Sequence, residues 1–281
     1  MKISVLVAMV LLVWSAARAQ TPAPGQTPAD YLKDIQIDTK NPIAPGGAVP
    51  VANEPHHALV LKNDFVHVFN VTVPPLDATL LHQHDLPYIY LTLGTTDVVN
   101  AVQGKPEVEL TLQDGATRFT PGGFAHVART DAGIPFHNIT IELVKPQASP
   151  RNLPEGSPER PLGSCPPASG EPRNPQIPNE QVVPCFETDE LRLAVVRVEG
   201  GKDYEEAAPQ TAALLVAESN ANLDVALGGQ HAAFLHAGDV LWLPAGTARR
   251  VQDFIGIRSS FLLLSFKDTG TSKSAATNSA D

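Results

Sequence analysis

The chain carries the stretch Gly115-Ala-Thr-Arg-Phe-Thr-Pro-Gly-Gly-Phe-Ala-His126 and, upstream of it, the short motif His82-Gln83-His84. Two imidazoles at this spacing on a strand point to one face, because side chains alternate along a strand. The Gly and Pro residues before His126 indicate a tight turn. A third His arriving from a distant strand completes one face of a coordination sphere, which suits Zn, Fe, Cu, Ni or Mn.

Short β-branched runs separated by turn residues surround these motifs, and no helical periodicity lies between them. In the first half they predict strands over 58–62, 66–73, 88–93, 97–102, 108–112, 116–119, 126–129 and 136–144. In the second half they predict strands over 182–186, 191–198, 212–217, 223–226, 231–235, 239–243, 248–252 and 260–266. Regularly spaced short strands of this kind are typical of sandwiches and barrels. We therefore expect an all-β chain with two domains.

Changes in composition divide the 281 residues into six parts. The stretch 145–184 holds eleven prolines and cannot be a central strand or a helix interior. The predicted parts are a signal peptide (1–19), a flexible N-terminal arm (20–52), a first barrel (53–145), a Pro-rich linker (146–183), a second barrel (184–267) and a disordered tail (268–281).

The N-terminus predicts export. A positive Met1-Lys2 precedes an apolar run from Ile3 to Trp14, and Ala17-Arg18-Ala19 offers the pattern that a signal peptidase reads. The run is shorter than the roughly 20 residues needed to span a bilayer, so we expect no stable membrane insertion. The mature protein is expected in a periplasm or outside the cell.

The two cysteines, Cys165 and Cys185, are predicted to form a disulfide, because exported proteins favour disulfides. A metal-binding or catalytic thiol pair is the competing interpretation, but no C-x-x-C spacing supports it. With 30 acidic and 20 basic residues, the formal charge is −10. This balance speaks against a nucleic-acid partner, which needs a basic face.

The second stretch resembles a motif of the cupin superfamily, G-x5-P-x-G-x2-H-x3-N. Gly115, Pro121, Gly123 and His126 match it, and Thr130 stands in place of the final Asn. This resemblance implies two cupin-type jelly-roll β-barrels in tandem, joined by the Pro-rich linker.

The first stretch resembles the other cupin motif, G-x5-H-x-H-x3/4-E-x6-G. His82 and His84 match its two histidines, and Leu76 replaces its leading Gly. The carboxylate ligand is missing, because its position falls on Pro87 or Tyr88.

The resemblance implies that His82, His84 and His126 hold one divalent metal ion, without distinguishing Fe, Mn, Zn, Cu and Ni. Three-histidine cupins occur in the superfamily, including thiol and diketone dioxygenases. The alternative is a barrel that keeps its histidines without metal, to hydrogen-bond a ligand.

Three further side chains are candidates for the site. Tyr88 lies near the register of the missing carboxylate, where its phenol would hydrogen-bond substrate or water, or serve as an unusual ligand. Asp85 would supply the missing carboxylate only if a β-bulge turned its side chain towards the histidines. His137 either lines the barrel mouth or supports a ligand, although a satisfied His on an apolar strand face is the competing interpretation. No role is assigned to His56, His57 or His67.

The second half repeats the later motif at Gly238, Pro244 and Gly246, with Arg249 in place of the His. The two His positions of the earlier motif fall on Ala207 and Pro209, or one residue earlier on Glu206 and Ala208. We therefore expect a degenerate second site without metal. Arg249 and its neighbour Arg250 would bind an anion, or the barrel has a structural role, which we favour.

The chain is thus expected to be an exported bicupin with one metal ion in its N-terminal barrel. It would be a metal-dependent oxygenase, isomerase or lyase, resembling dioxygenases, that acts on a small organic molecule, with Tyr88 as a catalytic residue. The alternative is a non-catalytic small-molecule-binding or structural cupin, because one fold hosts many functions. The expected partner is a small-molecule ligand or substrate, and a monomer and a homodimer both remain open.

Overall fold

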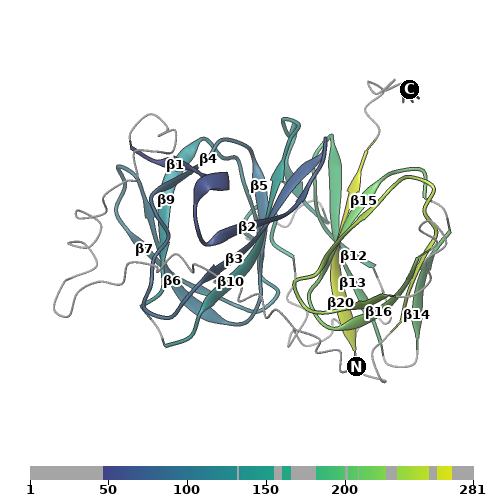
Figure 1. Ribbon diagram of the computed structural model, residues 1–281. Helices are drawn as coiled ribbons and strands as arrows, with labels where there is room; N and C mark the ends of the chain where they lie inside the picture. Colours follow the sequence, from purple (N-terminus) through teal and green to yellow (C-terminus); the bar gives the residue numbers. More distant parts are fainter. Residues whose placement is uncertain are drawn as a thin grey trace, which may run out of the picture.

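The computed structural model describes residues 47–131, 133–154, 160–165, 182–199, 202–207, 209–225, 233–252 and 258–267. The predicted signal peptide, most of the arm, much of the linker and the tail lie outside the described residues. Two barrels of strands lie side by side (Figure 1). The only helical element in the described ranges is a short 3-10 turn, η1 (Val51–Asn53), and none of their helices is long and apolar enough to cross a membrane.

The first barrel consists of two five-stranded sheets, which we call sheets A and B. Sheet A has the strand order β1-β4-β9-β6-β7, and sheet B has the order β2-β3-β10-β5-β8. The strands are β1 (Val49–Pro50), β2 (His57–Lys62), β3 (Val66–Val73), β4 (His82–His84), β5 (Tyr88–Thr92), β6 (Thr96–Val102), β7 (Val108–Leu112), β8 (Thr117–Thr120), β9 (Phe124–Arg129) and β10 (Phe136–Leu143).

The second barrel repeats this plan in sheets C and D. Sheet C has the order β11-β12-β13-β20-β15-β18, and sheet D has the order β14-β19-β16-β17. The strands are β11 (Arg151–Asn152), β12 (Val182–Glu187), β13 (Leu191–Val198), β14 (Asp203–Glu206), β15 (Ala213–Ala217), β16 (Ala221–Val225), β17 (Ala233–Leu235), β18 (Val240–Leu243), β19 (Arg249–Gln252) and β20 (Ser259–Phe266). The predicted all-β, two-barrel architecture is confirmed.

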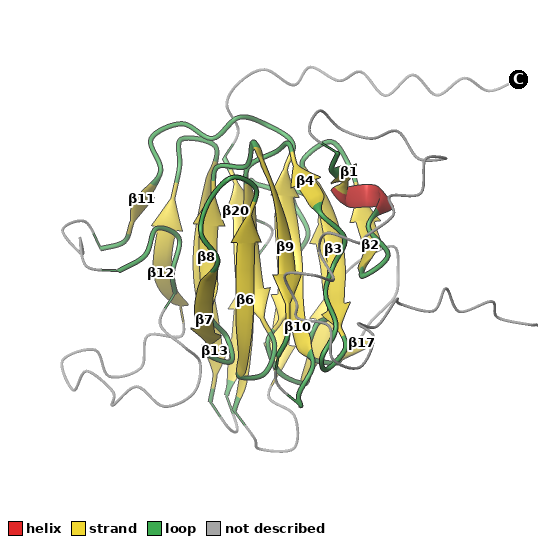
Figure 2. Ribbon diagram, turned by 90° about the vertical axis from the view of Figure 1, so that its left-hand side faces the viewer, coloured by secondary structure: helices red, strands yellow, loops and turns green. Residues whose placement is uncertain are grey.

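The outer faces of sheets B and C pack against each other and join the barrels. Ile139 and Ile141 of β10 lie in one buried cluster with Leu193 of β13 and Leu264 of β20. Full burial of each such side chain stabilises the folded state by roughly 1.5–3 kcal/mol. The cluster between the barrels therefore contributes strongly to stability. As a result β10 is buried on both faces. Figure 2 views the molecule from the side of the first barrel, with β6 and β9 of its sheet A towards the viewer.

The interiors of the two barrels are filled differently. The second barrel has a continuous apolar core that includes Leu215, Leu223 and Phe261. In the first barrel the interior apolar residues form two small clusters, one around Val98 and one around Phe69. The space between them holds the polar residues of the candidate site.

The predicted boundaries of the arm and the linker are wrong at their described ends. Val49 of β1, assigned to the flexible arm, is buried and pairs in parallel with His82 of β4. Arg151 of β11, assigned to the linker, pairs with Glu187 of β12. Short segments next to proline-rich sequence are thus ordered by pairing with a strand that is distant in sequence.

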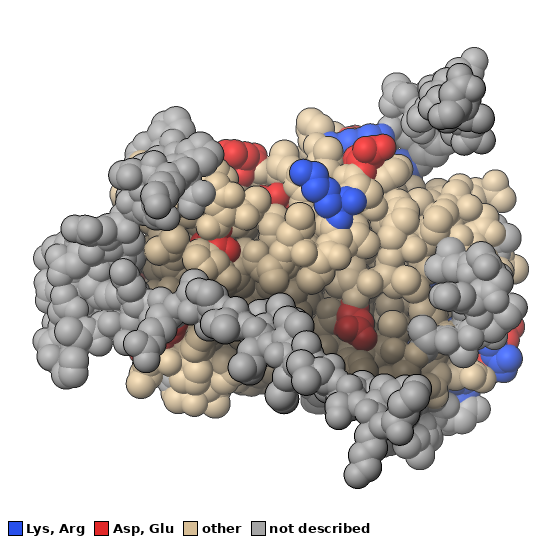
Figure 3. All heavy atoms as spheres, in the orientation of Figure 1, with Lys and Arg blue, Asp and Glu red and all other residues tan. Residues whose placement is uncertain are grey.

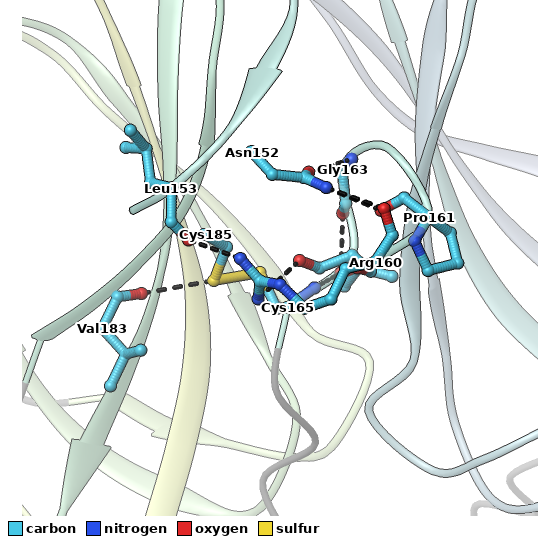
Figure 4. Close-up of a disulfide and its surroundings, with 10 residues drawn as sticks. Asn152, Leu153, Arg160, Pro161, Gly163, Cys165, Val183 and Cys185 are labelled. Carbon is cyan, nitrogen blue, oxygen red and sulfur yellow. Dashed lines mark hydrogen bonds between the residues drawn. A yellow bond between two sulfur atoms is a disulfide. The ribbon is translucent and has the colours of Figure 1, made fainter. Parts of the chain in front are cut away.

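The predicted disulfide between Cys165 and Cys185 is present, with 4.9 Å between the Cα atoms (Figure 4). It lies in the apolar cluster between the barrels. Asn152 fixes the adjacent loop, because its side chain accepts a hydrogen bond from the Gly163 amide at 2.8 Å and donates one to the Arg160 carbonyl at 3.0 Å. The disulfide therefore ties part of the predicted linker to the core.

The surface displays charge in small separate groups. On the face shown in Figure 3, acidic and basic side chains of the described residues lie as isolated clusters on a mostly uncharged surface.

The turn that leads into β4 contains a strained residue. Leu76 has a φ of 60° and is 63% exposed. This left-handed conformation is costly for a residue with a Cβ and is readily adopted by glycine. Hydrogen bonds from Thr130 to the carbonyls of Pro74 and Asp77 hold the turn in place. The position at which the cupin motif has Gly thus keeps the glycine-like backbone with a leucine side chain.

We predict that Leu76→Gly raises the free energy of unfolding by about 0.5–1 kcal/mol, because relief of the left-handed strain exceeds the entropic cost of glycine. Leu59→Gly is the control, since Leu59 is a half-exposed leucine of strand β2 without a positive φ, and it should lower stability. Urea unfolding of both variants measures the two effects. Equal destabilisation by the two substitutions contradicts the prediction.

Candidate metal centre

The three predicted ligands are brought together inside the first barrel. His82 of β4 faces His126 of β9 as a cross-strand pair, and their ring centroids lie 4.5 Å apart. The ring of His84 lies 5.1 Å from that of His82 and 5.4 Å from that of His126. The H-x-H alternation explains this arrangement, because His82 and His84 are buried on the inner face while Gln83 points away.

A fourth imidazole joins them that sequence reasoning missed. His57, at the start of β2, has its ring centroid 4.6 Å from that of His82 and 5.8 Å from that of His84. Ligand nitrogens of His57, His82 and His84 all lie within 4.8 Å of one another. His57 belongs to neither cupin motif, so only the pairing of β2 with β3 brings it to the site.

All four rings are oriented by a hydrogen bond at Nδ1. The Nδ1 of His82 donates to the Leu80 carbonyl at 2.9 Å, and that of His126 donates to Asn100 Oδ1 at 2.7 Å. Carboxylates accept from the other two rings. These bonds are His57 Nδ1 to Glu54 Oε2 at 2.5 Å and His84 Nδ1 to Glu142 Oε1 at 3.3 Å.

These hydrogen bonds leave the Nε2 lone pairs free for a ligand. The Nε2 atoms of His82 and His126 are buried and have no hydrogen-bond partner, which is costly unless something binds them. Histidine ligands of metals typically donate their other ring N–H to a carboxylate or carbonyl in this manner. The residues therefore fit a divalent metal ion held through Nε2.

Burial keeps the imidazoles in the neutral form that metals require. Burial lowers the pKa of His82 and of His126 well below 6.5, and repulsion from neighbouring imidazoles adds to the effect. Burial, followed by repulsion from His57, lowers the pKa of His84 to about 3. Metal binding at neutral pH therefore has little competition from protons at these three rings.

Two buried carboxylates support the histidines. Burial raises the pKa of Glu54, but hydrogen bonds from His56 and His57 outweigh it and leave the pKa below its ordinary value. Glu54 Oε1 also accepts a bond from the Leu80 amide at 3.1 Å, which links it to the segment before β4. Burial raises the pKa of Glu142, which lies between His67 and His84 at the inner face of β10.

A cavity of about 270 Å³ adjoins the four imidazoles. The predicted residue Tyr88 lines it, with its ring 4.4 Å from that of His84 and tilted by 30°. Burial raises the pKa of Tyr88, so its hydroxyl keeps its proton at neutral pH. Tyr88 is thus placed as a neutral hydrogen-bond donor next to the histidines.

The structure corrects two of the predicted site residues. His137 lies on the outer face of β10, where it bonds Asn70 Oδ1 at 2.9 Å and is close to Gly238 of the second barrel. The inner face of β10 is the one that carries Glu142, and the structure agrees with the competing interpretation of His137 as a hydrogen-bonded histidine on an apolar strand face. Asp85 is exposed, accepts a hydrogen bond from Gln83 and does not line the cavity.

The second barrel replaces the ligand pair by an ion pair. Glu206 of β14 and Arg249 of β19 form a cross-strand pair in the same way as His82 and His126. The guanidinium of Arg249 is buried and hydrogen-bonds to Glu206, so it already has an anionic partner within the barrel. Arg250, exposed, likewise pairs with Asp203. The Nε and Nη1 atoms of Arg249 are buried without a hydrogen-bond partner, so an anion site at these arginines stays a prediction.

The chain matches no protein-family model and no curated protein, but it does match solved structures. AerE from Microcystis aeruginosa is 8% identical, with 75% of this chain and 97% of that chain covered and a TM-score of 0.50. Salicylate 1,2-dioxygenase from Pseudaminobacter salicylatoxidans is 12% identical, with 74% and 75% covered and a TM-score of 0.52. A structure of salicylate 1,2-dioxygenase adducts with gentisate is 16% identical, with 80% and 75% covered and a TM-score of 0.51.

At these identities the likeness concerns the fold. Together with the motif residues and the two sets of paired sheets, it confirms the predicted resemblance: the chain has the two-barrel, or bicupin, fold.

We predict that the free energy of unfolding of the metal-free protein falls between pH 6.5 and about 5. The unfolded chain protonates its histidines near 6.5, whereas His82, His84 and His126 stay neutral in the folded state. Each such histidine lowers the free energy of unfolding by up to about 1.4 kcal/mol for every pH unit below 6.5. The raised pKa of His56 gives a stabilisation that is fully present below 6.5. Glu142, whose pKa is raised, and Glu218, whose pKa is raised to about 7, oppose the fall, but these two groups are outnumbered by the three histidines.

Denaturant unfolding at a series of pH values measures this slope. The double variant His82→Gln/His126→Gln removes two of the three groups and should flatten the curve. A wild-type stability that is constant between pH 7 and 5 contradicts the assignment of neutral buried rings.

Proposed function

We propose that this protein is a mononuclear metal-dependent enzyme that acts on a small organic molecule, of the oxygenase, isomerase or lyase type. One divalent ion, Fe, Mn, Zn, Cu or Ni, would be held by His57, His82, His84 and His126. When bound, such an ion supplies Lewis-acid or redox chemistry. The salicylate dioxygenase likeness in fold favours the oxygenase type among the three.

The observation that carries this proposal is the convergence of four oriented imidazoles on a cavity. Two of their Nε2 atoms are buried without a partner, a costly arrangement that a metal would relieve. A barrel with only a structural role needs no such cavity, as the continuous apolar core of the second barrel illustrates.

The side chains of this protein contribute binding and orientation. Glu54 and Glu142 hold the rings of His57 and His84. Tyr88, the cross-strand neighbour of Thr120, lines the cavity and keeps its proton at neutral pH, so it would donate a hydrogen bond to a substrate oxygen. Apolar side chains such as Phe124 and Phe136 line the cavity and limit the water in it.

We also propose that the protein is exported and acts in a periplasm or outside the cell. The disulfide between Cys165 and Cys185 supports this, because disulfides persist in oxidising compartments.

The test is metal reconstitution followed by assays of turnover. Protein freed of metal is loaded separately with Fe(II), Mn(II), Zn(II), Cu(II) and Ni(II), and bound metal is measured by mass spectrometry. Loss of small organic acids, alcohols and diketones, and oxygen uptake, are then followed. We expect one equivalent of metal per chain and turnover with at least one metal that a chelator abolishes.

The variant His57→Ala should weaken metal affinity by at least about tenfold, because even losing a group that only orients a ligand costs 10–100-fold. His236→Ala is the matched control, since His236 is an exposed histidine of the second barrel. Failure of wild-type protein to bind any of the metals contradicts the proposal. Metal binding without turnover of any compound contradicts the enzyme assignment and favours a non-catalytic binding protein.

A further inference from the structure

The cavity beside the histidines contains one permanent charge. Among its described lining residues, Arg118 of β8 is the only lysine or arginine, and none is an aspartate or glutamate. No carboxylate of the described residues forms an ion pair with Arg118. Arg118 is also exposed enough to meet a ligand that enters from solvent. A cation without a protein anion therefore stands at the cavity wall.

Tyr90 makes this cation part of a two-residue donor group. Arg118 and Tyr90 are a cross-strand pair of β8 and β5, and both side chains line the cavity. Burial raises the pKa of Tyr90, although Arg118 opposes the shift, so the phenol stays protonated. Since Tyr90 lines the cavity next to Arg118, its O–H is placed to donate to the same ligand group.

The donor pair lies one step along the sheet from the histidines. The neighbouring cross-strand pair on the same face is Tyr88 with Thr120, and the ring of Tyr88 lies 4.4 Å from that of His84. Residues two apart on a strand are separated by roughly 7 Å. A short molecule that binds Arg118 at one end can therefore extend from Tyr90 towards His84.

The remaining wall is suited to an apolar body. Sheet A lines the cavity opposite the sheet that carries Arg118, with the side chains of Val98, Leu110 and Leu112. The volume of about 270 Å³ lies below the usual range of drug-sized sites, roughly 300–1,000 Å³. The ligand is therefore small, with apolar atoms in its middle.

We infer that the cavity binds a small molecule with a carboxylate group, which Arg118 and Tyr90 hold, while its apolar body packs on sheet A and its other end faces the four histidines. The planar guanidinium binds carboxylates through parallel hydrogen bonds. The inference deepens the proposed function and rests on it for the chemistry at the histidines.

Calorimetric titration with benzoate, cyclohexanecarboxylate and pentanoate tests this substrate class, and the corresponding neutral amides serve as matched ligands. Each is titrated into metal-free and Zn(II)-loaded protein. We expect wild-type protein to bind at least one carboxylate, and to bind it at least tenfold more tightly than its amide. Arg118→Gln should weaken that binding by about tenfold or more in both forms, because hydrogen bonds to charged groups are strong.

Lys105→Gln is the control, because it removes one positive charge from an exposed turn of the same barrel that does not line the cavity. It should leave carboxylate binding unchanged. Absence of carboxylate binding, equal binding of acids and amides, or equal affinity of wild-type and Arg118→Gln protein overturns the inference.

The titrations of metal-free protein distinguish a failure of this inference from a failure of the proposed function. Carboxylate binding that depends on Arg118 in a protein that takes up no metal supports the carboxylate site while the proposed enzyme fails. One equivalent of zinc without any dependence on Arg118 overturns the carboxylate site and leaves the metal centre intact.

Discussion

The burial of four imidazoles around one point is the constraint on which the rest of the first barrel depends. Buried rings are tolerated there only if each Nδ1 finds a hydrogen-bond partner, and Glu54, Leu80, Glu142 and Asn100 provide them. Those acceptors come from separate parts of the barrel, so the ring orientations depend on the whole pairing of sheets A and B. The Nε2 atoms of His82 and His126 then have no partner within the protein, which is an energetic cost that a bound metal would remove.

The second barrel shows what the same fold does without this constraint. At the cross-strand position of His82 and His126 it has Glu206 and Arg249, which neutralise each other. Its interior is then filled by apolar side chains, whereas the first barrel keeps a cavity. The second barrel contributes instead through its outer face, which covers sheet B and gives the first barrel an apolar support.

Much of the fold could be predicted from the sequence, because strand alternation and turn residues are local signals. The strands β3, β7 and β13 match their predicted ranges, and the motif histidines converge as expected. His57 escaped notice because only long-range pairing and the Glu54 hydrogen bond bring it to the site. The inner face of β10 could not be identified from the sequence, because the second barrel buries its outer face too, so both faces of that strand are buried and apolar residues no longer mark the interior.

The most direct test of the central claim is a crystal structure of the metal-loaded protein, with the ion located by anomalous scattering at its absorption edge. The geometry of the metal-free rings predicts one ion per chain in the first barrel, bound by Nε2 of His57, His82, His84 and His126, and none in the second barrel. A fully loaded crystal in which the ion lies elsewhere, or in which His57 is not a ligand, contradicts the account.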